Sequence, residues 1–367
     1  MAGSTAAGQV HVPALPQMQA AALCPAKHSE TSDVQGMLMK KGGTGVSHPN
    51  IALVKYWGKK DAESNTALNA SISITVDKLT TTTRVYESSA DEMFINGVKT
   101  QMSSRHAAVL SAFRQKAGYS GCLRVVSENS FPHSCGLASS ASGFAALVLA
   151  LDDFFSLCLC KAELSEFARI GSGSASRSIF SGIAIYEGRR ARKLCDWEEL
   201  RVFVVVVESN AKSVGSTLGM TRTARTSSLF QERLRNIGRK VERAVGYVQE
   251  RNFEALALLA MRESNEMHAV CLDSWPPIMY LNDESFRVID LCLKYNEDGV
   301  RVAYTFDAGP NAFILTLDSS LLIQRCLNKG DGSSVSKDKI VKILPPIEGS
   351  ARADSARPFP FGHPAWI

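Results

Sequence analysis

The chain has 367 residues, and 41 Lys and Arg against 36 Asp and Glu give it a formal net charge of +5 at pH 7. With 45% hydrophobic and 21% charged residues, the composition is that of a soluble globular protein, and the length predicts about two domains. So small a net charge argues against electrostatic binding of nucleic acid and is compatible with small anionic ligands.

Cysteine usage argues against a disulfide-bonded or zinc-binding protein, and hydropathy argues against a membrane-spanning protein. The nine Cys residues form neither CxxC pairs nor Cys/His groups at zinc spacing, so we expect a reducing compartment and no dedicated metal-ligating residues. The longest apolar stretch, residues 138–151, is shorter than the ~20 residues that span a bilayer. We therefore expect no membrane partner.

The first 45 residues lack hydrophobic periodicity, and they lack the basic start and apolar core of a secretory signal. They contain no Arg, which argues against a mitochondrial presequence. We predict a mobile N-terminal extension over residues 1–45.

Hydrophobic periodicity predicts strands and helices from residue 48 onward. The predicted strands cover residues 50–58, 71–76, 80–86, 123–130 and 201–209, and a strand, turn and strand cover residues 302–317. The predicted helices cover 144–158, 161–170, 234–248 and 253–261. Because residues 201–209 are almost uniformly apolar, that strand should be central and buried.

A change in composition over residues 208–217 predicts a domain boundary. The chain then divides into the extension, an N-terminal nucleotide-binding lobe over 46–207, a C-terminal lobe over 208–345, and an irregular tail over 346–367 that is rich in Pro and Gly.

A loop rich in small residues lies between the strand at 123–130 and the next helix. It contains Gly136, Ser139, Ser140, Ser142 and Gly143. Small residues before a helix let backbone N–H groups approach an anion, which the helix dipole also favours. The loop is not a Walker pattern, so the residues alone leave open a phosphate site or a tight turn. A second such loop, residues 171–177, adds an Arg, whose planar guanidinium suits carboxylate or phosphate.

Two charged residues stand out by their surroundings. Lys55 lies within a predicted apolar strand, where an ammonium group is costly unless it meets an anion such as a carboxylate. The alternative is a surface Lys on an edge strand. Asp307 comes just before Gly309 in a predicted turn, where it would either support the turn or act in catalysis.

Five segments carry a resemblance to a known family. They are NIALVKYWGKKD (50–61), FPHSCGLASSASG (131–143), GSGSASRS (171–178), SNEMHAVCLDSWPPIMYLN (264–282) and AYTFDAGPNA (303–312). Together they resemble the mevalonate diphosphate decarboxylases, a family within the galactokinase, homoserine kinase, mevalonate kinase and phosphomevalonate kinase superfamily. KYWGK and FDAGPNA are the most specific strings, and the sequence around Asp307 favours the decarboxylase branch over the simple kinases.

The resemblance implies a two-lobed α+β fold of the small-molecule kinase superfamily, with mixed sheets, helices, a ferredoxin-like C-terminal lobe and an active site in the cleft between the lobes. It implies that ATP and Mg²⁺ serve to phosphorylate the tertiary 3-hydroxyl of mevalonate 5-diphosphate. Loss of that phosphate with CO₂ then gives isopentenyl diphosphate for isoprenoid and sterol biosynthesis. Mg²⁺ is usually held by substrate phosphates and one or two protein oxygens, so a dedicated acidic cluster is not required.

The resemblance also assigns site residues. Asp307 would orient the hydroxyl and accept its proton, Lys55 would hold that carboxylate ionised, and Arg177 would bind the departing carboxylate. The implied substrate-binding residues are Tyr56, Trp57, Gly58, Lys59, Arg105, Ser172, Gly173, Ser174, Ala175, Ser176, Arg177 and Thr217. The implied ATP-binding residues are Gly136, Leu137, Ala138, Ser139 and Ser140. We interpret His268 as a packing residue of a buried helix.

Rival readings remain open at this point. One is an enzyme that phosphorylates a mevalonate phosphate at the 3-hydroxyl and stops, or that decarboxylates the monophosphate. Another is a catalytically silent homologue that serves as a regulatory or binding subunit, although the presence of Asp307 and Lys55 argues against it. Residues 133–135 and the C-terminal segment depart from the family pattern. The resemblance further implies a homodimer in the cytosol or in a peroxisome-like organelle.

Overall fold

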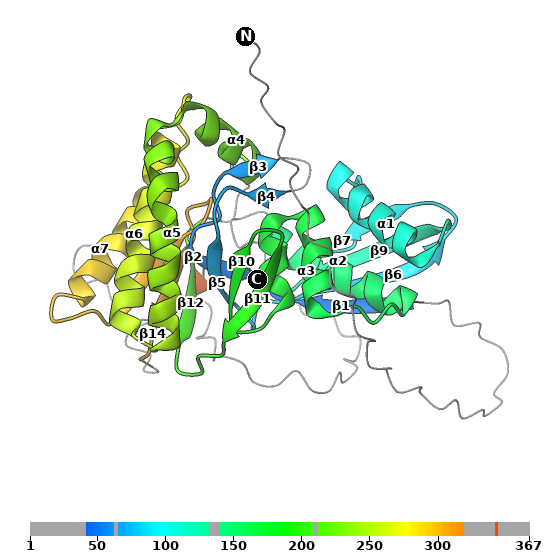
Figure 1. Cartoon of the computed structure of the whole chain (residues 1–367), viewed down its shortest axis with the longest axis horizontal. Helices are drawn as coiled ribbons and strands as arrows, with labels where there is room; N and C mark the ends of the chain where they lie inside the picture. Colours follow the sequence, from blue (N-terminus) through cyan, green and yellow to red (C-terminus); the bar gives the residue numbers. More distant parts are fainter. Residues whose placement is uncertain (1–41, 62–64, 132–138, 209–211, 319–341, 344–367) are drawn as a thin grey trace, which may run out of the picture. The chain divides into compact units, whose positions relative to one another are not determined.

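The computed structural model describes residues 42–61, 65–131, 139–208, 212–318 and 342–343. All described residues, drawn as coloured ribbons in Figure 1, belong to one compact unit of the chain, Lys40–Ile367. Most of the predicted extension and the whole predicted tail lie outside the described residues. The described part contains both helices and mixed sheets, which confirms the predicted α+β class.

The first sheet has the strand order β1-β6-β9-β7-β8 and packs against a helix. Its strands are β1 (Gly42–Ser47), β6 (Thr81–Ser88), β9 (Cys122–Asn129), β7 (Glu92–Ile95) and β8 (Val98–Lys99). Helix α2 (Ser139–Phe155) lies on β1 and β6, and the other helices of this region are α1 (Ser104–Ala117) and α3 (Lys161–Gly171). All three helices share one core with this sheet.

Glycines explain why β1 was missed in the sequence. A Cβ on Gly43 would lie 2.3 Å from the Ala150 carbonyl oxygen, and one on Gly45 would lie 2.2 Å from that of Ala146. These glycines therefore let α2 approach the strand backbone closely. GGTGVS has little hydrophobic pattern, so the sequence predicts residues 42–45 as part of the extension, whereas the structure has them in β1.

The second sheet has the order β11-β10-β5-β2 and carries much of the buried core. Its strands are β11 (Arg190–Cys195), β10 (Ile183–Glu187), β5 (Ser71–Thr75) and β2 (Asn50–Val54). Because β2 ends at Val54, Lys55 follows the strand instead of lying within it, which corrects the prediction. Two short elements overlap the predicted substrate-binding segments 56–59 and 172–177. The first is a strand pair, β3 (Lys59–Asp61) and β4 (Thr66–Ala67), and the second is a 3-10 helix, η1 (Gly173–Ile179).

The third sheet has the order β13-β14-β12-β15. Its strands are β13 (Val302–Phe306), β14 (Ala312–Thr316), β12 (Arg201–Val206) and β15 (Lys342–Ile343). Strand β12 is central and almost fully buried, as its uniformly apolar sequence predicted. It lies before the predicted boundary at residue 208, yet it pairs with strands that come after that boundary. The sheet pairing therefore places β12 with the C-terminal part of the chain.

Helices of the C-terminal part connect the second and third sheets. They are α4 (Ser216–Thr226), α5 (Ser228–Gln249), α6 (Phe253–Leu272) and α7 (Asp283–Tyr295). Helix α6 packs against β13 and also against β2, so it touches both sheets that end near the predicted catalytic residues. Helices α1, α4 and α7 were not predicted, and α2 ends at Phe155, before the predicted end at Cys158.

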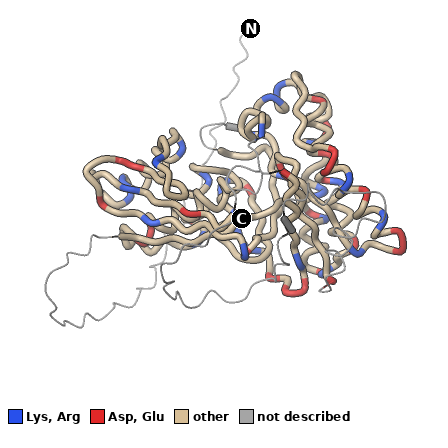
Figure 2. Tube along the Cα trace, turned by 180° about the vertical axis from the view of Figure 1, so that it is seen from behind, with Lys and Arg blue, Asp and Glu red and all other residues tan. Residues whose placement is uncertain are grey.

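No helix among the described residues is long and apolar enough to cross a membrane. Lys and Arg are interspersed with Asp and Glu along the described trace (Figure 2).

Candidate active site

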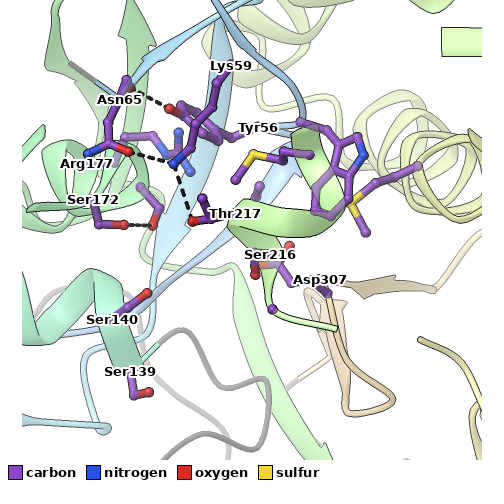
Figure 3. A pocket seen from close by; sticks show the side chains of 18 of the residues that line it. Tyr56, Lys59, Asn65, Ser139, Ser140, Ser172, Arg177, Ser216, Thr217 and Asp307 are labelled. Carbon is purple, nitrogen blue, oxygen red and sulfur yellow. Dashed lines mark hydrogen bonds between the residues drawn. The ribbon is translucent and has the colours of Figure 1, made fainter. Parts of the chain in front are cut away.

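The candidate site is a cavity of about 480 Å³ (Figure 3). Its lining side chains come from the segment after β2, from the N-termini of α1 and α2, from η1, from α4 and from the turn after β13. The lining residues that the sequence predicted are Tyr56, Trp57, Lys59, Arg105, Ser139, Ser140, Ser172, Gly173, Ser174, Arg177, Thr217 and Asp307. They lie on both sides of the predicted boundary at residue 208, as expected for a site between two lobes.

Lys55 and Asp307 form an ion pair at one side of the cavity. The Lys55 Nζ lies 2.9 Å from Asp307 Oδ1 and also donates to the Ala52 carbonyl at 2.8 Å. The Lys55 side chain is 1% exposed, whereas Asp307 is 28% exposed and reaches the cavity. The alternative of a surface Lys on an edge strand is therefore wrong. Burial lowers the pKa of Lys55, and the nearby Asp307 and Glu263 carboxylates oppose that shift.

Arg177 is a buried guanidinium with one unused nitrogen. Its Nε donates to Ser73 Oγ at 2.8 Å and to Asn50 Oδ1 at 3.3 Å, and its guanidinium lies 5.8 Å from the centre of the Tyr56 ring. Its Nη1 is buried without a protein partner. Burial lowers the pKa of Arg177 to about 10, so the group stays cationic at neutral pH. A cation fixed on one side and unsatisfied on the other is suited to bind a carboxylate.

Lys59 and Arg105 bring further positive charge to the cavity. The Lys59 Nζ donates to Asn65 Oδ1 at 2.6 Å and to Thr217 Oγ1 at 3.4 Å (Figure 3). Burial and the neighbouring Arg105 lower the pKa of Lys59 to about 8. Arg105 donates to the Gly171 carbonyl at 3.4 Å, and within the described part of the chain neither Arg105 nor Lys59 forms an ion pair with a carboxylate. Lys59 and Arg105 are neighbouring cations in one cavity, so an anion bound between them would relieve their mutual repulsion.

The start of η1 packs closely against Tyr56. A Cβ on Gly173 would lie 2.0 Å from the Tyr56 hydroxyl oxygen, which itself donates to the Asn65 carbonyl at 2.6 Å. Ser172 Oγ and Ser174 Oγ lie 3.1 Å apart and both line the cavity. These two hydroxyls and Gly173 therefore line the same cavity as Lys59, Arg105 and Arg177.

The predicted phosphate loop is described only in part. Ser139 and Ser140 form the first turn of α2 and line the cavity, so the helix dipole points its positive end there. Ser142 has a different role, because its hydroxyl lies 2.7 Å from Thr81 Oγ1 and ties α2 to β6. Gly136, Leu137 and Ala138 lie outside the described residues, and their assignment stays a prediction.

Three predicted substrate residues do not line the cavity. Gly58 has a φ of +88°, and a Cβ there would lie 2.3 Å from the Phe230 ring, so the residue permits a turn and close packing. Ala175 and Ser176 are buried within η1. A role of these residues in substrate binding stays a prediction, and their observed contacts are those of supporting structure.

The sequence analysis missed several residues of the cavity. They are Ala52, Asn65, Lys212, Gly215, Ser216, Met220, Met267 and Ala308. Lys212 is the most notable of these because its Nζ donates to Ser216 Oγ at 2.9 Å and to the Ala308 carbonyl at 3.0 Å. It thus places another positive charge beside Asp307. A Lys in a Ser-rich segment gives little indication of a functional role by itself. The one indication in the sequence was that Lys212 lies five residues before Thr217, a predicted substrate-binding residue.

His268 is buried between aromatic rings, with ring centres 6.3 Å from Tyr280 and 6.2 Å from Phe306. Burial lowers its pKa to about 3, so the imidazole is neutral, as expected for a packing residue. Among the described residues, no group of three or more His, Cys, Asp or Glu could hold a metal ion. A divalent cation would need phosphate oxygens as additional ligands, and Asp307, Ser139 and Ser140 are among the oxygen-bearing side chains that line the cavity.

Comparisons with known proteins give matches over most of the chain. Residues 47–195 match the diphosphomevalonate decarboxylase-like N-terminal domain, and residues 202–342 match the mevalonate 5-diphosphate decarboxylase C-terminal domain. The diphosphomevalonate decarboxylase of Eremothecium gossypii is 39% identical over 300 residues, which cover 73% of this chain and 76% of that protein.

Solved structures show the same likeness. The mevalonate diphosphate decarboxylase from Staphylococcus aureus has a TM-score of 0.76 and 34% identity, covering 85% of this chain and 97% of that chain. The complex of MDDEF with MVAPP, AMPPCP and magnesium also has a TM-score of 0.76, with 32% identity and coverage of 84% and 97%.

Fold and site thus define an α+β protein of the small-molecule kinase superfamily, with a cationic cavity beside a Lys–Asp pair. Within that class, the chain belongs to the diphosphomevalonate decarboxylase family.

Proposed function

We propose that the chain catalyses the ATP-dependent decarboxylation of (R)-mevalonate 5-diphosphate to isopentenyl diphosphate, with ADP, phosphate and CO₂ as the other products. The observation that carries this proposal is the ion pair of the buried Lys55 with Asp307, whose carboxylate lines the same cavity as the Arg177 guanidinium with its unpartnered Nη1. The Lys55–Asp307 pair is suited to activate a hydroxyl, and the Arg177 guanidinium is suited to bind a carboxylate. Identity of about 40% to named decarboxylases over most of the chain supports the assignment.

In the first step, Asp307 orients the 3-hydroxyl of the substrate and accepts its proton as the oxygen attacks the terminal phosphorus of ATP. ADP is the leaving group. General-base assistance of this kind is worth about 10²- to 10⁴-fold in rate. The buried Lys55 keeps the carboxylate in place and balances charge as the phosphoryl group is transferred.

In the second step, the C–O bond to the new phosphate breaks, and the bond between the carboxylate and the chain breaks with it. The electrons of that C–C bond form the alkene, and CO₂ and phosphate leave. Arg177 holds the carboxylate during this step through its free Nη1, because Ser73 and Asn50 fix the opposite edge of its guanidinium.

The remaining charges suit the phosphates. Lys59, Arg105 and the Ser172–Ser174 hydroxyls would bind the diphosphate of the substrate, and Thr217 would contact it beside Lys59. Ser139 and Ser140 at the start of α2 would receive the phosphates of ATP, and Lys212 lines the same cavity. Mg²⁺ would neutralise the phosphate oxygens near these hydroxyls. The magnesium and ATP-analogue complex of a related decarboxylase supports these ligands.

A paired product assay tests the proposal. Purified protein is given ATP, Mg²⁺ and mevalonate 5-diphosphate, and ADP and CO₂ are measured in parallel, with Asp307→Asn as control. We expect the two products in a one-to-one ratio and their loss in the variant. ADP without CO₂ would contradict decarboxylation, and turnover of the monophosphate in preference to the diphosphate would contradict the proposed substrate.

We also infer a homodimer that works in the cytosol or in a peroxisome-like organelle, as family resemblance suggests. Light scattering of the purified chain tests the oligomeric state, and a monomer at working concentration would contradict the dimer. Fractionation with organelle markers tests the compartment, and recovery with a secretory or mitochondrial marker would contradict it.

A further inference from the structure

A buried ion pair lies behind the cavity, outside its lining. Arg233 of α5 donates from Nη1 to Glu263 Oε1 at 3.0 Å and from Nη2 to Glu263 Oε2 at 2.8 Å. Their side chains are 0% and 1% exposed, and neither lines the cavity. Burying two charges costs so much desolvation that such a pair is weak evidence for stability. Its contacts indicate a different role.

The pair holds both backbone polar groups of Lys55. The Lys55 N–H donates to Glu263 Oε2 at 3.1 Å, and Arg233 Nη2 donates to the Lys55 carbonyl at 3.3 Å. Asn69 Nδ2 donates to the same carbonyl at 2.9 Å. Because β2 ends at Val54, these side-chain bonds take the place of a strand partner for Lys55. The backbone from which the Lys55 ammonium reaches Asp307 is therefore fixed by α5 and α6.

The next residue of α6 holds the other half of the catalytic pair. Ser264 Oγ accepts a hydrogen bond from the Phe306 N–H at 2.9 Å. Phe306 is the last residue of β13 and directly precedes Asp307. Two consecutive side chains of one helix thus contact the two backbone segments that carry Lys55 and Asp307, which are 252 positions apart in the sequence.

Glu263 is an ionised carboxylate at neutral pH. Burial alone would raise the pKa of Glu263, but the Arg233 guanidinium and the Lys240 ammonium lower it to about 2. Lys240 lies 2.9 Å from Glu263 Oε1 and also pairs with Glu266. The groups that face Glu263 are therefore Arg233, Lys240 and the Lys55 backbone, with the Lys55 ammonium and Glu266 close by.

From these contacts we propose that Glu263, together with Arg233, and Ser264 are positioning residues that set the Lys55–Asp307 geometry for phosphoryl transfer. The inference rests on the proposed function. None of the three side chains touches substrate. They act through the backbones of Lys55 and Phe306, and a displacement of about 1 Å at the reacting groups can cost on the order of 10²-fold in rate.

Ser264→Ala is the first test, with Lys240→Met as the matched control. Ser264→Ala removes one buried acceptor, whereas Lys240→Met removes a partner of Glu263 that contacts neither Lys55 nor Phe306. For Ser264→Ala we expect kcat to fall about 10-fold or more, with KM for both substrates within about 3-fold and an unchanged circular dichroism spectrum. For Lys240→Met we expect kcat within about 2-fold of the original protein.

The double variant Arg233→Met/Glu263→Met is the second test. Replacing a whole buried pair with apolar residues avoids a lone buried charge and is often tolerated, so this variant should fold. We expect a fall in kcat of about 100-fold at near-normal KM. Two results would overturn the positioning role. One is an equal kcat in the original protein, Ser264→Ala and the double variant. The other is a loss in kcat in Ser264→Ala and the double variant that is no larger than the loss in Lys240→Met. An inactive original protein would overturn the proposed function itself, and this inference with it.

Discussion

Gly173 and Tyr56 are in such close contact that no side chain fits between them. A Cβ on Gly173 would lie 2.0 Å from the Tyr56 hydroxyl oxygen, and that hydroxyl is held by its 2.6 Å hydrogen bond to the Asn65 carbonyl. Tyr56 in turn lies beside Arg177, so this one contact connects the Ser-rich loop to the carboxylate-binding cation.

Gly173→Ala should therefore both destabilise the protein and weaken substrate binding. Overpacking of this kind costs about 1–3 kcal/mol, and it would displace Tyr56 from Arg177. Thermal unfolding and KM for mevalonate 5-diphosphate check this. Gly246→Ala is a matched control, because a Cβ there meets nothing within 4 Å on α5, and it should raise the melting temperature slightly. Equal melting temperatures and equal KM values in the two variants would contradict the close packing of Gly173 against Tyr56.

Asp307→Asn should bind both substrates nearly normally but lose turnover by about 10²- to 10⁴-fold, because an amide cannot accept the proton of the hydroxyl. The change also leaves the buried Lys55 ammonium without its counter-ion, so the melting temperature should fall. Calorimetric titration and single-turnover kinetics measure the two effects. Turnover within 10-fold of the original would remove Asp307 from the mechanism.

Arg177→Ala should weaken substrate binding and slow the loss of CO₂, because the carboxylate loses its fixed partner. Arg105→Ala should instead raise KM with a smaller effect on kcat, since Arg105 is assigned to the diphosphate. The ratio of CO₂ to ADP separates the two variants, with a lower ratio expected for Arg177→Ala. An unchanged ratio and unchanged kinetics in that variant would show that the carboxylate binds elsewhere.

Substrate affinity should depend on pH through Lys59. Its pKa is lowered to about 8 by burial and by Arg105, so in the free protein the ammonium is charged below that pH and loses its proton above it. Affinity for the anionic diphosphate should therefore be full at pH 7 and decline as the pH rises through about 8 to 9. Lys59→Arg, which stays protonated, should remove that decline. A binding curve with the same pH dependence in both proteins would rule out Lys59 as its source.

Deletion of residues 1–41 should leave turnover within about 2-fold, because every described element begins at or after Gly42. Deletion of residues 1–47 should be much more harmful. It removes β1, whose six residues pair with β6 and whose glycines receive α2. Soluble yield, melting temperature and kcat compare the two truncations, and a loss of activity in the shorter deletion would show that the extension takes part in function.

Some of the fold could be read from hydrophobic pattern alone. Strand β12 is central and buried because a run of Val residues leaves no polar face, and helices α5 and α6 follow from apolar residues at steps of three and four. Strand β1 could not be read in this way, whereas the amphipathic helix α7 carries such a pattern although the sequence analysis does not predict it. The glycines of β1 have no side chains to form a pattern, and their value lies in the approach of α2, a contact between segments about 100 positions apart.

The sequence by itself determined the types of group in the site. A Lys in an apolar setting, an Asp in a turn and an Arg in a Ser-rich loop each carry a chemical meaning that does not depend on the fold, and the order of the motifs identified the family. Only the tertiary structure decided which groups meet. Lys55 reaches Asp307 across 252 positions, Arg177 is fixed by Asn50 and Ser73, and Glu263 holds the backbone of Lys55. Local pattern reports whether a residue is apolar or polar, whereas these partnerships arise from sheets and helices that pair distant segments and exclude water between them.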